Sequence, residues 1–98
     1  MTLEQRNYSG QRAKEVLENE EFIAAFDAIE KELIESWKSS PKRDLEGREK
    51  IFQYLTLLEK VKAQLVSTME SGKLAQADLE HKRSLLQQGK DVMQRFGL

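Results

Sequence analysis

Two apolar stripes at helical spacing, separated by the only proline of the chain, constrain the fold most. The first stripe consists of Phe22, Phe26, Ile29, Leu33 and Trp37. The second stripe consists of Ile51, Tyr54, Leu58, Val61, Leu65 and Met69. Steps of three and four residues place each set on one side of an α-helix. Pro41 cannot continue a helix that needs its backbone N–H, so the sequence predicts two helices that fold back as an antiparallel hairpin.

Composition indicates one small all-α domain. The 98 residues are 39% apolar and 34% charged, and Leu, Glu, Lys, Gln and Ala outnumber the β-branched residues. The absence of cysteine excludes disulfides and thiolate chemistry. Because no apolar run approaches the roughly 20 residues of a membrane span, and the first residues lack the apolar core of a signal peptide, we expect a soluble, intracellular protein.

Capping residues set the expected helix limits. Asn19 and Asp44 are the predicted N-caps of helices over 20–39 and 44–71, with Ser40 before Pro41 as the alternative cap for the second. Residues 1–8 are expected to be loosely ordered, followed by a short helix capped by Ser9. The expected organisation is an N-terminal arm with a short helix (1–18), an antiparallel helical hairpin (19–72) and a C-terminal helix (73–98).

The junction near Gly72 has two interpretations. Gly is common just past a helix C-terminus, so the second helix is expected to end near residues 71–72 and a third helix to pack on the hairpin. The same Gly is also compatible with a bend in one long rod that extends from the hairpin. The result in either case is a small helical bundle, which we expect to be oligomeric because so small a domain gains from burial against a partner.

No catalytic, cofactor or metal site is predicted. His81 is the only histidine, and with Asp78 or Glu80 it supplies fewer ligands than the three or four of a zinc site. Nucleophile elbows, phosphate-binding loops and dinucleotide-binding glycines are missing from the sequence. We therefore expect a protein that is not an enzyme, that needs no cofactor and that has no small-molecule substrate.

Charge is distributed unevenly along the chain. Residues 15–35 contain eight acidic residues and one basic residue, which is typical of a solvated helix face or of a surface that docks a basic partner. The predicted turn and the start of the next helix carry basic residues instead. The candidate nucleic-acid contacts are Lys42, Arg43, Arg48 and Lys50.

The second helix of the hairpin has more apolar residues than one stripe needs. A helix that is apolar over much of its circumference usually contacts more than one neighbour. Trp37, at the end of the first helix, either closes the core or acts as a hot spot of an interface. The predicted protein interface consists of Phe52, Leu55, Leu57, Val66 and Trp37.

Three segments of the chain carry a resemblance. They are A-K-E-V-L-E-N at 13–19 with the stripe from Phe22 to Trp37, R-D-L-E-G-R-E-K at 43–50, and E-S-G-K-L-A at 70–75. Over residues 13–75 the chain resembles a group of short helical proteins encoded in tailed bacteriophages and prophages, commonly near packaging and head genes. The resemblance implies a phage context in the host cytoplasm or the virion, and it brings no catalytic residues.

Three functions fit these observations. The leading hypothesis is a non-enzymatic assembly module that acts in virion assembly or DNA packaging by helical self-association and by binding another phage or host protein. The second is a DNA-packaging subunit similar to terminase small subunits, which would bind DNA through basic hairpin tips. The third is an inhibitor of a host protein that uses the acidic helix.

Overall fold

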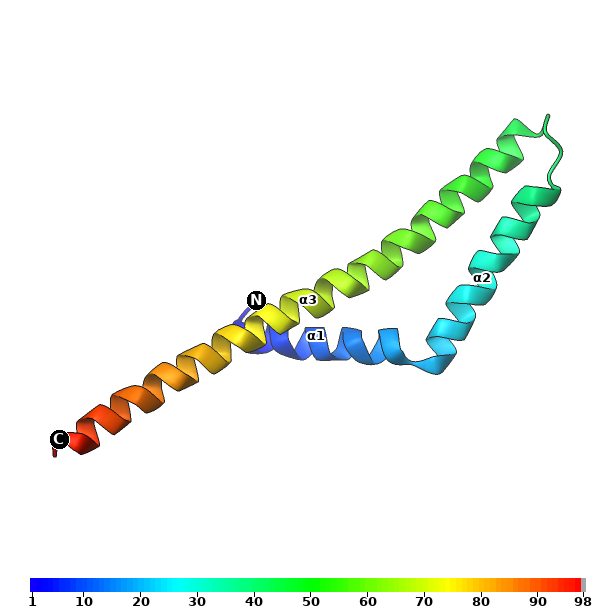
Figure 1. Ribbon diagram of the computed structural model, residues 1–98. Coiled ribbons are helices and arrows are strands. Elements are labelled where there is room, and N and C mark those ends of the chain that lie inside the picture. Colours follow the sequence, from blue (N-terminus) through cyan, green and yellow to red (C-terminus); the bar gives the residue numbers. More distant parts are fainter. Residues whose placement is uncertain (98) are drawn as a thin grey trace.

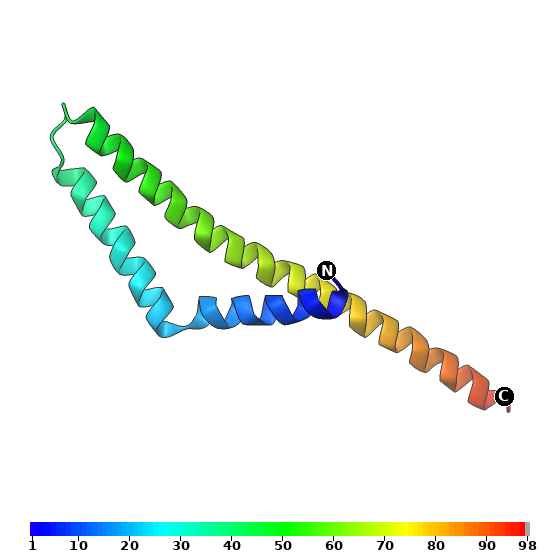
Figure 2. The same cartoon turned by 180° about the vertical axis from the view of Figure 1, so that it is seen from behind.

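The computed structural model describes residues 1–97, and within them it contains three α-helices and no strand. The helices are α1 (Leu3–Glu18), α2 (Glu20–Ser39) and α3 (Leu45–Arg95). Figure 1 shows α3 as one long rod, with α1 lying against its middle and α2 returning to its start. The reverse view in Figure 2 shows the same closed loop of three helices. The predicted all-α class is therefore confirmed.

The helix starts at Asn19 and Asp44 agree with the prediction. The Asn19 side chain accepts a hydrogen bond from the Phe22 N–H at 2.9 Å, and Asp44 accepts one from the Gly47 N–H at 3.0 Å. A Cβ at Gly47 would collide with the Asp44 carboxylate, so the glycine makes room for this cap. The chain is non-helical between Ser39 and Leu45, which confirms the break at Pro41. These two caps satisfy N–H groups that the first turns leave without helical partners.

The expectation of a loosely ordered N-terminus was wrong. α1 begins at Leu3, because Thr2 forms a capping box with Gln5. The Thr2 hydroxyl accepts from the Gln5 N–H at 3.1 Å, and the Gln5 side chain accepts from the Thr2 N–H at 2.9 Å. This reciprocal pair satisfies two N–H groups at once. Ser9 is consequently an interior residue of α1 and not its cap.

The predicted helix end at residues 71–72 was also wrong. α3 continues through Gly72 to Arg95, so the separate C-terminal helix expected from residue 73 is the second half of one rod. Of the two interpretations of Gly72, the long rod is correct. Among the described residues, positive φ is confined to Gly97, so Gly72 does not adopt the left-handed conformation that commonly ends helices.

α1 crosses α3 where the two backbones touch. A Cβ built on Gly10 would lie 2.5 Å from the Gly72 Cα, and a Cβ on Gly72 would lie 2.5 Å from the Gly10 Cα. Ala13 and Ala75, one turn further along each helix, are the buried hydrophobic residues of the described chain. The close approach therefore depends on four small residues, two from each helix.

An arginine on α1 fixes this crossing from the side. The Arg6 Nε donates to the Ser71 hydroxyl at 3.1 Å, and its Nη2 donates to the Ser71 carbonyl at 3.2 Å. Both acceptors belong to the residue before Gly72, so Arg6 holds α1 in register with α3. Hydrogen bonds to a charged donor are stronger than those between neutral groups.

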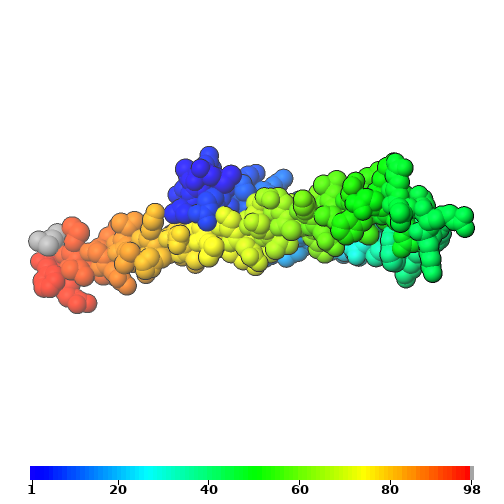
Figure 3. All heavy atoms as spheres, turned by 90° about the horizontal axis from the view of Figure 1, so that it is seen from above, coloured from blue at the N-terminus to red at the C-terminus, as the bar shows by residue number. Residues whose placement is uncertain are grey.

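The molecule is elongated and buries little of its apolar surface. It measures 82 × 24 × 17 Å, with a radius of gyration of 22.8 Å against about 13 Å for a compact domain of this length. Its accessible surface is 8156 Å², whereas a compact monomer of this mass exposes about 5,800 Å². Figure 3 shows the C-terminal part of α3 projecting past α1 without a neighbour. The isolated chain thus leaves roughly 2,400 Å² more surface in water than a compact fold.

We predict that Gly72→Ala destabilises the protein although alanine favours helices. The new methyl group would meet the Gly10 backbone, so α1 must move away. Overpacking typically costs 1–3 kcal/mol, which exceeds the gain in helix propensity of about 1 kcal/mol. Urea unfolding followed by circular dichroism at one protein concentration measures the difference. Lys73→Ala, at the exposed neighbouring position, is the control; an unchanged or raised midpoint for Gly72→Ala would contradict the crossing.

Candidate protein-interaction surfaces

The end of the molecule at the α2–α3 turn is held by a cation–π contact. The Arg48 guanidinium lies 4.5 Å from the centroid of the Trp37 ring, and its Nη1 is 3.4 Å from the Ser40 hydroxyl. Stacking of this kind is attractive because the ring face is electron-rich. Arg48 is half-buried, so it serves to tie the start of α3 to the end of α2.

The four predicted nucleic-acid contacts do not form one cluster of free cations. Lys42 and Arg43 are exposed in the turn between α2 and α3. Arg48 is occupied by Trp37, and the Lys50 Nζ lies 4.0 Å from the Glu46 carboxylate. Within residues 1–97 the turn therefore offers two cations without ion-pair partners, and the other two are engaged inside the chain.

The predicted interface residues are divided between different parts of the surface. Phe52 and Leu57 are 62% and 60% exposed and line one depression of about 290 Å³ on the outside of α3. Leu55 and Val66 are half-buried. Trp37 is 43% exposed beneath Arg48. Phe52 and Leu57 are thus the pair that the structure brings together.

Val66 belongs to a second, larger groove along α3. This groove has a volume of about 690 Å³, and small residues such as Ala63 and Ser71 line it beside Val66 and the exposed Leu74. Arg6 closes one end of it, where it also bonds Ser71. Glu59, Lys62 and Glu70 also line this groove, so its lining combines small, apolar and charged residues.

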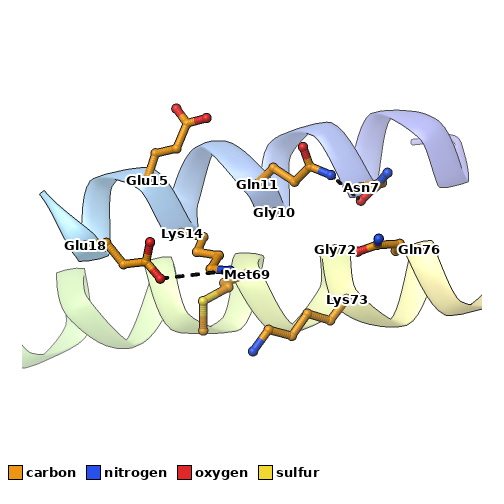
Figure 4. Close-up of a pocket in the computed structure, with 10 residues that line it drawn as sticks. All are labelled: Asn7, Gly10, Gln11, Lys14, Glu15, Glu18, Met69, Gly72, Lys73 and Gln76. Atoms are coloured by element: carbon orange, nitrogen blue, oxygen red, sulfur yellow. Dashed lines mark hydrogen bonds and ion pairs between the residues drawn. The ribbon is translucent and has the colours of Figure 1, made fainter.

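A polar groove lies on the other side of the crossing. Figure 4 shows it between α1 and α3, with Gly10 and Gly72 facing each other at its base. Its volume is about 460 Å³, and most of its lining side chains are polar or charged. The interactions within it are local, such as Lys14 Nζ to the Glu18 carboxylate at 4.0 Å. Because these groups are mostly exposed, the groove lacks the dry surroundings typical of a ligand pocket.

The most exposed surface lies on the part of α3 beyond the crossing, which we name the overhang (residues 80–95). Every residue of the overhang is exposed, including Leu85, Leu86, Val92 and Met93. Sequence reasoning placed these residues on a third helix but assigned them no role. The sequence signal for this arrangement is the recurrence of small residues at Gly10 with Ala13 and Gly72 with Ala75, which marks where α1 crosses α3.

Two structural features are absent from the part of the chain that the structure describes. Within residues 1–97, the carboxylates and His81 do not gather into a group of three or more with the geometry to hold a metal ion. In the same range, no helix combines the length and apolar character needed to cross a membrane.

Comparison with known proteins identifies no relative of this chain. The chain matches no protein-family model, no curated protein and no solved structure.

We predict that Arg48→Ala loosens the turn without unfolding the chain. Removing the guanidinium exposes the Trp37 ring and deletes a contact of about 0.5–1 kcal/mol. Trp37 is the single tryptophan, so its fluorescence reports this end of the molecule. We expect a red-shifted emission and stronger iodide quenching in Arg48→Ala, and neither change in Arg43→Ala. Identical spectra for the two variants and the wild type would show that the contact is absent in solution.

Proposed function

We propose that this protein is a non-enzymatic assembly module that works by helical self-association and by binding a further protein. In the phage context implied by the sequence resemblance, this role belongs to virion assembly or DNA packaging. The observation that carries the proposal is the large apolar surface of a chain whose buried hydrophobic residues, within 1–97, are two alanines.

The energetics of burial support a partner. Each Å² of apolar surface removed from water contributes about 25 cal/mol, and a stable interface takes about 800 Å² from each chain. The excess surface of roughly 2,400 Å² leaves room for such an interface without opening the fold. Exposed large apolar residues, among them Phe52, Leu57 and Leu86, occur on both halves of α3, so the rod offers surface for more than one contact.

Self-association is measurable directly. We expect light scattering to give a mass of at least twice 11.4 kDa at micromolar concentrations, with dissociation on dilution. Burial of apolar surface also makes unfolding concentration-dependent, so the thermal midpoint should rise with protein concentration. A mass of one chain at every concentration up to the millimolar range would remove self-association from the proposal.

DNA binding by the turn is the second candidate, because Lys42 and Arg43 lie exposed without ion pairs at one end of the rod. This candidate predicts binding of duplex DNA at low salt. Changing both residues to Ala should weaken binding and lower the log–log salt slope by about two. Arg48→Ala should leave the slope nearly unchanged, since that guanidinium lies on Trp37. Absence of binding at low salt eliminates this candidate.

A further inference from the structure

We propose that the overhang is the self-association site, and that a second copy of this chain crosses it at Gly89 in the antiparallel direction. The inference rests on the proposed self-association and assigns it a place and a geometry. It starts from a glycine that the fold of one chain does not explain.

Gly89 lies inside α3, where glycine is among the least favourable residues. A Cβ built on it would have no atom within 4 Å, so no contact within the described chain requires its small size. Gly10 and Gly72, by contrast, lie where two helices touch backbone to backbone. A contact between helices therefore explains why residues 10 and 72 are glycines. Within residues 1–97 no such contact explains Gly89.

The surroundings of Gly89 have the form of a helix-docking site. The positions three and four residues away on either side are its neighbours on the helix surface. All four are apolar and between 47% and 69% exposed: Leu85, Leu86, Val92 and Met93. The missing side chain of Gly89 thus leaves a gap bordered by apolar side chains that nothing else in residues 1–97 covers. Lys82 lies on the same side, where its aliphatic stem extends the apolar surface while its ammonium group reaches water.

The pattern is complementary to a second copy of itself. If two overhangs pair antiparallel about a two-fold axis between residues 87 and 88, Leu86 of each copy lies opposite Gly89 of the other. The Leu86 side chain of each copy then fills the gap over Gly89 of the other copy. Both copies use the same surface, so the contact is isologous, as in most dimers. A parallel pair in register would place Leu86 against Leu86, and these two bulky side chains would hold the helices apart at the level of Gly89. The antiparallel arrangement is therefore the one that the residues favour.

The exposed surface of the whole chain exceeds what a stable dimer buries. A stable dimer takes about 800 Å² from each chain, and the chain exposes roughly 2,400 Å² beyond a compact monomer. The overhang contributes to this excess with every one of its residues.

The first test fills the gap over Gly89. Gly89→Leu should raise the dimer dissociation constant at least tenfold, measured by sedimentation equilibrium of the full chain. Because Leu favours helices more than Gly does, circular dichroism should show equal or greater helix content, which separates lost association from lost folding. Gln87→Leu adds the same side chain at an exposed position about 160° around the helix from Gly89, and we expect it to leave the constant unchanged.

The second test reads the direction of pairing. The chain has no cysteine, so single variants carry the only thiol. In the antiparallel pair, residue 82 of one copy opposes residue 93 of the other. Oxidising a mixture of Lys82→Cys and Met93→Cys chains should give mixed disulfide dimers, while each variant alone stays uncrosslinked. Links within each variant alone would overturn the antiparallel arrangement.

The outcomes separate this inference from the function on which it rests. If the wild type associates but Gly89→Leu associates equally well, the overhang is not the site, while self-association stands. If the wild type stays monomeric, both the inference and the self-association fail together.

Discussion

The contact between Gly10 and Gly72 is the constraint on which the rest of the structure depends. α2 contributes no buried residue, and the buried residues of α1 and α3 are Gly10 with Ala13 and Gly72 with Ala75. One residue, Asn19, joins α1 to α2, and a short turn joins α2 to α3. Once α1 is fixed on the middle of α3, these short connections leave α2 one direction in which to return. The crossing thus closes the loop of helices seen in Figure 1.

The same contact explains why α3 does not end at Gly72. A glycine in a helix interior costs about 1 kcal/mol relative to alanine, and by itself it favours an end or a bend. Because Gly72 has no Cβ, the backbone of α1 can lie directly against it. The close contact between the atoms of the two helices adds favourable dispersion energy. The two hydrogen bonds from Arg6 to Ser71 add to this stabilisation next to the glycine. Tertiary packing therefore decides a boundary that local preference would place differently.

The features that could be predicted from the sequence are those that act over a few residues. Asn19 and Asp44 cap helices through their own N–H neighbours, and Pro41 interrupts the chain locally. The capping box of Thr2 and Gln5 is equally local. No apolar periodicity follows it, so a prediction based on apolar stripes missed the start of α1. The outward position of Phe52 and Leu57 also followed from their place beside the main stripe.

The remaining features depend on pairs of residues far apart in the sequence. Gly10 and Gly72 have no apolar side chain, so neither belongs to an apolar stripe and the stripe pattern does not indicate their contact. Arg48 belonged to a basic cluster by sequence, yet Trp37, across the turn, holds it and removes it from the free cations. The overhang is exposed because α1 begins at Leu3 and crosses α3 near Gly72, so it does not reach residues 80–95. The sequence of α1 or of α3 taken alone does not indicate this crossing point.

Continuity of α3 gives the molecule two unlike ends at a fixed distance. Lys42 and Arg43 lie at one end, and the apolar overhang lies at the other. At 1.5 Å per residue, about 65 Å of helix separate the start of α3 from Gly89. In the proposed antiparallel dimer the two turns would point in opposite directions, about 130 Å apart. A partner bound at either turn would then meet no competition from the dimer contact, and the length of α3 would set the spacing between the two bound partners.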